Sequence, residues 1–410
     1  MLQIILNKKY GKGSITYILS PKYFLVGILV GFITCCFLGY IGSEKFLFQD
    51  FKRFFWPIEP QTLYYPTASE LLMTARHEVS KDKILVLLGG SSIFRGAGQD
   101  PNELWSDELQ RILGDRYKVL NYATDGASFS SFGGVVYRML RKEYSKIIFV
   151  IATFPFNSQG QIDGLDPYSY LFWDAYYKKL FIPENKEGVV IKQVRKEQMK
   201  TYAGMEQHIV SFLDSFFYFR DLWNWVGYHL LFTVWSDFEF QKPFLSRQHF
   251  EDEPISPEYR KVLAAANNDD EHLQNALKFL HDMVGNVIQD VLDKNPHVKE
   301  AVKMGGTQGY DTVFPSEDRS KILCVQTAYN SRFLSATNHN IQAGYRAFFK
   351  QSHTMLQSLG YNALDVGFGF PEEDYIDLSH FSGSGGKKMA VMVAKKIKSM
   401  SVLNGYIKHE

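Results

Sequence analysis

The chain has 410 residues, of which 45% are hydrophobic and 15% aromatic. That length is sufficient for one large domain or two ordinary ones, with a sizeable buried core. The formal net charge is only +1. This balance argues against the strongly basic surface that nucleic acids and other polyanions require, so we expect no nucleic-acid partner.

The first feature along the chain is an apolar run, YFLVGILVGFITCCFLGYIG, over residues 23–42. At ~1.5 Å per residue, a helix of this length crosses a hydrocarbon core of ~30 Å. The positive-inside rule predicts a cytoplasmic segment 1–22 and an extracytoplasmic remainder of the chain, placing the anchor in the cell (inner) membrane. A cleaved signal peptide is the alternative. The run is long for that, and Tyr40 breaks the small-residue cleavage pattern before Ser43. An uncleaved anchor is therefore favoured.

Three cysteines are present, and they do not form a disulfide framework. Cys35 and Cys36 lie inside the apolar run, and Cys324 lies in a strand-like run, so we expect buried thiols. The clustered Cys and His spacings of a zinc site are absent from the sequence. We expect neither a metal nor a cofactor.

Residues 43–80 form a stalk that ends in a short helix, and its aromatic side chains would suit a membrane interface. From residue 81 onward, apolar β-branched runs alternate with helical patterns, which is typical of a parallel sheet covered on both faces. The prediction is an α/β domain over 81–400, with three α/β/α layers of a flavodoxin-like kind and a tail at 401–410. The expected strands are 83–90, 117–124, 145–153, 321–329 and 361–366, and the expected helices are 103–114, 130–143, 340–359 and 385–400.

A long insertion, about 156–318, separates the third expected strand from the fourth. It is too long for a loop and must carry structure of its own, which we expect to be mainly helical. Its segment 205–235 is strongly aromatic. A helical cap packed on the core is the favoured interpretation, and a surface that lies on the bilayer or docks a membrane partner is the alternative. Asp214, Arg220 and Asp221 argue against a second spanning helix.

Polar residues follow the expected strands at their carboxyl ends, where sites of open α/β sheets lie. Ser91 and Ser92 come after the first strand, Gly126 after the second, and Asp377 and His380 after the last. A serine, a histidine and an aspartate supply a nucleophile, a base and the group that orients the base. Each piece alone is common in turns and helix caps, and the spacing alone does not choose between the two serines.

These residues resemble the SGNH (GDSL-type) hydrolase superfamily of serine esterases and acyltransferases, over about 81–155 and 320–400. The first block of that superfamily is often written GDSITRG, and Gly90–Gly96 here reads GSSIFRG. The resemblance implies that Ser92 is the nucleophile and that Ser91 stands where the family usually has Asp. An alternative alignment, shifted by one residue, makes Ser91 the nucleophile.

Two further blocks match and one departs. Asn121 and Gly126 match the second block, N-x-x-x-x-G, which implies that Gly126 donates to an oxyanion. Asp377 and His380 match the D-x-x-H block, which implies the other two members of a catalytic triad. The third block, G-x-N-D, is missing, and Asn157 comes about four residues late. Either Asn157 or another group replaces that oxyanion donor, or the site lacks it, at a cost of about 10²–10³ in kcat.

The anchor, the Gly-Ser-Ser block, the departing third block, the insertion and the terminal D-x-x-H together resemble one branch of the superfamily. This branch includes the D-alanyl-lipoteichoic-acid transfer proteins and envelope polysaccharide O-acyltransferase proteins such as the alginate acetylation group. The resemblance implies an anchored extracytoplasmic serine acyltransferase or esterase that acts on O-acyl groups of a cell-envelope polymer. It implies a membrane-bound O-acyltransferase as partner. The alternative is a non-catalytic scaffold that binds such a partner.

Overall fold

The computed structural model describes most of the α/β core and the apolar N-terminal helix. Described residues are 21–45, 67–100, 102–123, 134–153, 169–181, 191–192, 195–223, 226, 314, 316–330, 339–376 and 379–408.

A sheet of five parallel strands forms the centre of the protein, in the order β2-β1-β3-β4-β5. The strands form because short β-branched and leucine-rich runs are buried on both faces, as parallel sheets require. The prediction of an α/β fold with five parallel strands is confirmed. Chain order reverses between β1 and β3, which makes that crevice the switch point where sites of such sheets form. The strands are β1 (Ile84–Gly89), β2 (Tyr117–Asn121), β3 (Ile147–Thr153), β4 (Ile322–Thr327) and β5 (Asn362–Val366).

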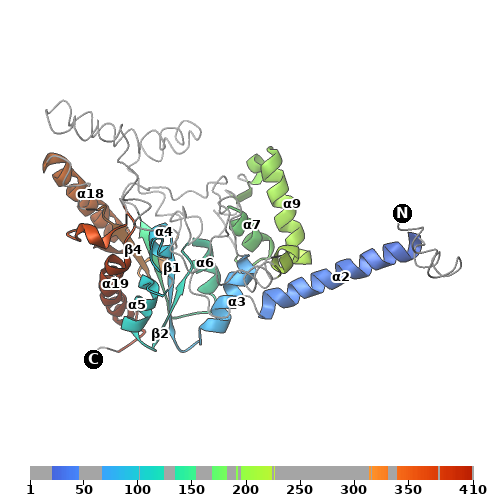
Figure 1. Ribbon diagram of the computed structural model, residues 1–410, viewed down its shortest axis with the longest axis horizontal. Coiled ribbons are helices and arrows are strands. Elements are labelled where there is room, and N and C mark those ends of the chain that lie inside the picture. Colours follow the sequence, from blue (N-terminus) through green and yellow to red (C-terminus); the bar gives the residue numbers. More distant parts are fainter. Residues whose placement is uncertain are drawn as a thin grey trace.

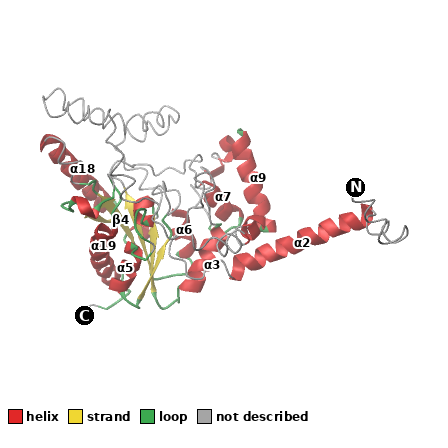
Figure 2. Cartoon of the chain, viewed as in Figure 1, coloured by secondary structure: helices red, strands yellow, loops and turns green. Residues whose placement is uncertain are grey.

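Helices cover both faces of the sheet (Figures 1 and 2). Alternate side chains of each strand point to opposite faces, so Leu85 and Leu87 of β1 enter one hydrophobic cluster and Val86 and Leu88 enter the other. The first cluster is completed by α3 (Ala68–Glu78), α6 (Gly134–Leu140), α7 (Ser169–Tyr177) and part of α18 (His339–Ser358), and the second by α5 (Trp105–Leu113) and α19 (Gly383–Leu403).

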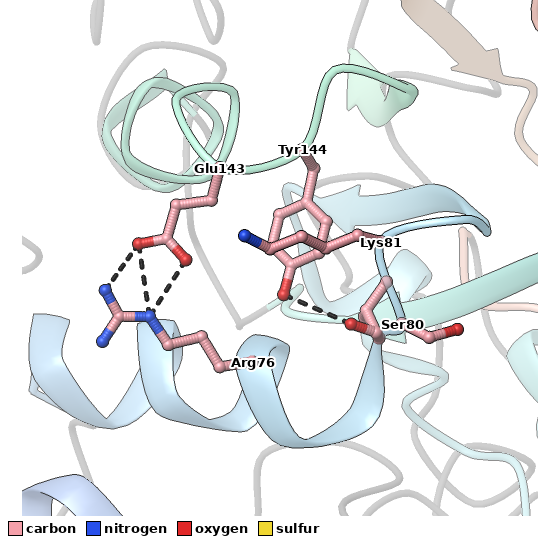
Figure 3. Close-up of a pocket in the computed structure, with 6 residues that line it drawn as sticks. Arg76, Ser80, Lys81, Glu143 and Tyr144 are labelled. Atoms are coloured by element: carbon pink, nitrogen blue, oxygen red, sulfur yellow. Dashed lines mark hydrogen bonds and ion pairs between the residues drawn. The ribbon is translucent and has the colours of Figure 1, made fainter.

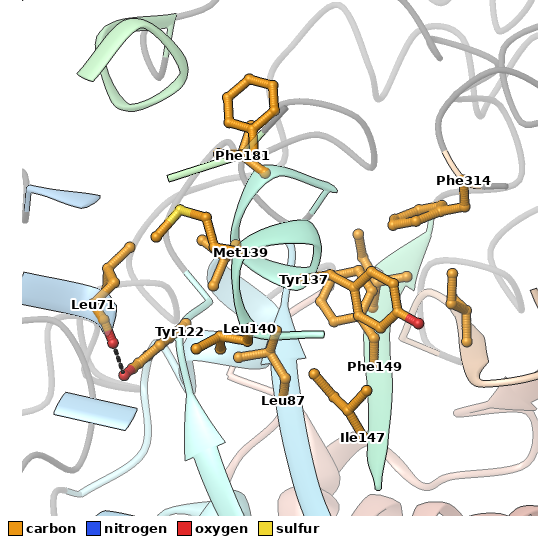
Figure 4. Close-up of a cluster of buried hydrophobic side chains, with 14 of the residues drawn as sticks. Leu71, Leu87, Tyr122, Tyr137, Met139, Leu140, Ile147, Phe149, Phe181 and Phe314 are labelled. Carbon is orange, nitrogen blue, oxygen red and sulfur yellow. Dashed lines mark hydrogen bonds between the residues drawn. The ribbon is translucent and has the colours of Figure 1, made fainter. Parts of the chain in front are cut away.

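Aromatic rings fill the first cluster (Figure 4). The ring centroids of Tyr137 and Phe149 are 5.7 Å apart, and Phe314 lies 5.6 Å from Tyr137 and 5.8 Å from Phe149. Tyr122 donates its hydroxyl to the carbonyl of Leu71 in α3 at 2.8 Å. This bond and the burial of one face of α3 show that the last part of the expected stalk (43–80) belongs to the core.

Helix α2 (Pro21–Lys45) extends away from this body as a single apolar rod (Figure 1). Most of its large side chains are between 46% and 63% exposed. Within the described residues, Pro21–Ile41 is the one segment long and apolar enough to cross a membrane. The three cysteines are free. Cys324 is buried as expected, whereas Cys35 is exposed and Cys36 is partly exposed on this helix. Burial raises the pKa of the Cys324 thiol.

The described part of the insertion is helical and consists mainly of α7 and α9 (Tyr202–Phe217). A buried cluster of charges joins these two helices to the residues that follow α9. Lys178 Nζ lies 3.0 Å from Asp174 Oδ1, 2.9 Å from Asp214 Oδ2 and 3.0 Å from Asp221 Oδ2. The Thr67 hydroxyl, just before α3, donates to Asp221 at 2.6 Å. The cluster therefore fastens this part of the insertion to the core.

Candidate functional site

The site begins where β1 ends. Gly90 has a φ of +99°, a conformation that side chains rarely adopt. A Cβ there would come within 3.0 Å of the Ala152 nitrogen in β3. Glycine therefore lets the chain turn tightly against the neighbouring strand and enter the short helix α4 (Ser92–Arg95).

Neighbouring side chains fix the backbone of α4. The carbonyl of Phe94 accepts the indole N–H of Trp105 at 2.7 Å and the side-chain amide of Asn121 at 3.0 Å. Gly96 closes the turn with a φ of +80°, and the next amide donates back to the Ser92 carbonyl at 3.0 Å. Ser92 is thus held in place by β2 and α5.

Ser92 Oγ lies 2.7 Å from His380 Nε2, and both residues are half-buried. Strands β1 and β5 are three positions apart in the sheet, roughly 14 Å at the usual strand spacing of about 4.8 Å. The chain after β5 must therefore cross back over the carboxyl edge of the sheet to bring the imidazole to the serine.

Tyr375 holds that crossing segment on the sheet edge. Its buried hydroxyl lies 3.2 Å from the carbonyl of Ala328, after β4, and 3.1 Å from that of Gly367, after β5. Burial raises the pKa of Tyr375, which keeps the hydroxyl protonated as a donor. An antiparallel bridge between Tyr375 and Phe381 then closes a tight loop, in which the Ile376 amide donates to the His380 carbonyl at 2.9 Å.

Asp374, the residue just before this loop, is bonded to the start of α19. The carboxylate of Asp374 accepts from Ser384 Oγ at 2.8 Å and pairs with Lys388. The amide of Ser382 donates to the Asp374 carbonyl at 2.8 Å. Gln99, just after α4, donates to the Phe381 carbonyl at 3.4 Å and so links the loop to the serine side of the site.

The two candidate serines are in different environments. Ser91 caps α4 and is buried, and its Oγ bonds to nothing in the part of the chain that is described. Ser92 faces the imidazole. The other predicted site residues, Asp377, Gly126 and Asn157, lie outside the described residues, so the structure brings together Ser92 and His380 from that set.

Sequence reasoning missed several residues that position the site. Tyr375, Asp374, Gln99 and Trp105 carry no recognisable motif, because they act through hydrogen bonds and ion pairs to backbone groups and side chains elsewhere in the chain. The one sequence signal for Tyr375 was its position, two residues before the D-x-x-H block. Asn121 was part of a sequence motif, but its bond to α4 was not predicted.

A separate hollow lies at the opposite edge of the sheet, before β1 and β3 (Figure 3). Arg76 and Glu143 form an ion pair across it at 2.6 Å, and the Tyr144 hydroxyl donates to the Ala75 carbonyl at 2.9 Å. Because it adjoins the amino ends of these strands, it takes no part in the Ser92 site. Within the described ranges, no group of His, Cys, Asp and Glu side chains could hold a metal ion.

No protein-family model and no curated protein sequence matches the chain.

Proposed function

We propose that the protein is a serine acyltransferase or esterase with Ser92 as its nucleophile and His380 as its general base. The observation that carries this proposal is the 2.7 Å contact between Ser92 Oγ and His380 Nε2. It joins residues 288 positions apart at the carboxyl edge of a doubly wound sheet, where such folds build their sites.

The reaction runs in two halves. As Ser92 Oγ attacks the carbonyl carbon of an ester, His380 Nε2 takes the hydroxyl proton, and it returns that proton to the departing alcohol. The acyl group is then bonded to Ser92. An acceptor hydroxyl, or water, gives its proton to His380 and attacks the acyl carbon. The bond from that carbon to Ser92 Oγ then breaks, and His380 returns the proton to Oγ, which releases the product and restores the serine. Transfer and hydrolysis use the same residues and differ in whether water reaches the acyl-serine.

Negative charge develops on the carbonyl oxygen during each attack and requires donors. The amide of Ser92 is one candidate, since it begins α4 and bonds to no acceptor in the described part of the chain. By resemblance, Gly126 supplies a second donor and Asn157 a third, and Asp377 orients the imidazole. This completes the SGNH-type arrangement that the sequence motifs suggest.

The location completes the proposal. We place α2 across the cell membrane and the α/β domain on its extracytoplasmic side, where the acceptor would be a hydroxyl of a cell-envelope polymer. A membrane-bound O-acyltransferase would be its partner. The apolar helix and the motif resemblance support this placement.

Labelling of the full-length chain in detergent with a fluorophosphonate probe tests the proposal. The native protein should be labelled, Ser92→Ala should not, and Ser91→Ala is the matched control that should keep the label. Hydrolysis of p-nitrophenyl acetate should fall at least about 10³-fold in Ser92→Ala and in His380→Ala.

Two outcomes would count against the proposal. Labelling of Ser92→Ala at the native level would remove Ser92 as nucleophile. Background hydrolysis by the native protein, together with no labelling, would favour the non-catalytic scaffold.

A further inference from the structure

Helix α9 has an apolar face that stays partly exposed, although the edge of Phe212 contacts Tyr177 of α7 at a ring-centroid distance of 5.7 Å. Side chains four, three and four positions apart, Met205, Ile209, Phe212 and Phe216, share this face, and Phe216 is 62% exposed. The buried face of the helix, which carries Gly204, His208, Ser211 and Asp214, packs against α7. We call the exposed set the α9 stripe.

The carboxyl end of α9 meets α2 near one end of its apolar span. The rings of Phe217 and Phe32 lie 5.1 Å apart, and those of Tyr218 and Tyr40 lie 5.3 Å apart. The backbone of Tyr218 passes so close to Gly39 that any side chain at position 39 would collide with the Tyr218 carbonyl.

These contacts set the depth of α9. Gly39 stands two residues before Ile41, where the apolar span ends, or about 3 Å along the helix axis. The Phe32–Phe217 ring contact lies about 10 Å further into the span, since seven residues separate Phe32 from Gly39. If α2 crosses a membrane, the carboxyl end of α9 lies at the membrane boundary, and the ring of Phe217 reaches into the hydrocarbon region.

The direction of α9 agrees with that depth. In Figure 1, α9 rises away from α2 instead of running beside it, and α7 covers the side of α9 away from the free length of α2. The side of α9 that α7 leaves open is thus the side toward the free length of α2, and the exposed stripe is not on the face that packs against α7. A helix across the direction of a spanning helix, with its apolar face toward the lipid, has the geometry of an interfacial helix.

We propose that the α9 stripe is immersed in the boundary region of the bilayer that α2 spans, as a second membrane attachment. The occupant of the face is lipid, because the stripe continues the apolar surface of α2 through the Phe32–Phe217 contact. The inference rests on the placement of α2 in the membrane. It fixes the orientation of the domain relative to the bilayer, which a single flexible anchor does not.

The buried charge cluster keeps the stripe in this position. Asp214 lies on the face of α9 opposite the stripe, and it pairs with Lys178 of the adjoining segment. Asp214 also accepts the Arg220 amide at 2.8 Å, which holds the turn after α9. These bonds prevent α9 from rotating to bury its apolar face against the body.

Nitroxide labels on the full-length chain test the proposal. In a background in which Cys35 and Cys36 are alanine, one label is placed at Phe216→Cys or Ile209→Cys. Val391→Cys is the matched control, since this apolar residue is 56% accessible and belongs to α19, which lies on the other side of the sheet from α9 in Figure 1. Leu29→Cys reports whether α2 itself is in the membrane. Each variant is reconstituted in vesicles of phosphatidylethanolamine and phosphatidylglycerol.

Collision rates with oxygen, which concentrates in lipid, and with an aqueous nickel chelate give the depth of each label. Labels at Phe216→Cys and Ile209→Cys should collide less often with nickel and more often with oxygen than the label at Val391→Cys. Nickel collisions at Phe216→Cys equal to those at Val391→Cys would overturn the proposal. Protection that disappears when protein is diluted in lipid would also overturn it, in favour of a second copy. Nickel accessibility at Leu29→Cys would show that the placement of α2 had failed first.

Discussion

Replacement of Lys178 by methionine is a direct test of how α7 and α9 are fastened to the core. The ammonium group faces three carboxylates at 2.9–3.0 Å, and its side chain is only 4% exposed. Methionine keeps most of the side-chain volume but removes the charge. The three aspartates, all 0% exposed, then lose the cation that they share.

Removing one partner of a buried ion pair usually costs about 3–5 kcal/mol, because the charge left behind has neither water nor a counter-ion. Other donors remain for the aspartates, such as the Thr67 hydroxyl to Asp221 and the Ala68 amide to Asp174. We therefore expect Lys178→Met to lower the free energy of unfolding by about 3 kcal/mol, the lower end of that range. This is a large part of the 5–15 kcal/mol that typically stabilises a domain.

The assay is urea unfolding of the full-length chain in detergent, followed by tryptophan fluorescence. Trp173 is a suitable reporter because its ring lies 4.2 Å from that of His208 in α9. Lys200→Met is the matched control, since it breaks an exposed ion pair with Glu197 at 2.5 Å and should cost less than about 0.5 kcal/mol. A loss in Lys178→Met no larger than that of the control would refute the reasoning.

Two further predictions concern pH and the turn before the serine. Burial raises the pKa of Asp221 from 3.8 to about 6, against the attraction of Lys178. The folded state therefore keeps a proton on Asp221 that the unfolded chain releases, so the contribution of Asp221 to the unfolding free energy should decrease as pH rises from 3.8 to about 6. Asp221→Asn should weaken this decrease, and an unchanged pH profile would contradict the assignment. Gly90→Ala should cost more stability than Gly114→Ala, because both have positive φ but only Gly90 presses on Ala152. Strain alone costs about 1–2 kcal/mol, so equal losses in thermal unfolding would exclude the contact as a cause.

The sequence by itself determined the local elements and their type. The expected strand over 83–90 and the expected helix over 340–359 lie within two residues of β1 and α18. Such elements are readable because burial on both faces produces uninterrupted apolar runs and burial on one helical face produces a repeat of three to four residues. The apolar helix α2 was readable for the same reason, since its composition and length are local properties.

Only the tertiary structure decided the order of the strands and the pairs of residues that meet across it. Ser91 and Ser92 are adjacent and chemically alike, and their local sequence does not distinguish them. The turn at Gly90 buries one and aims the other at His380, a consequence of where the segment after β5 crosses the sheet. Likewise, the sequence favoured a cap packed on the core for the aromatic segment of the insertion but left a membrane-facing surface open. The packing of α7 decides which face of α9 is buried, and it leaves the α9 stripe exposed beside α2. The sequence could not show this, because contacts between distant segments leave no periodic signal in it.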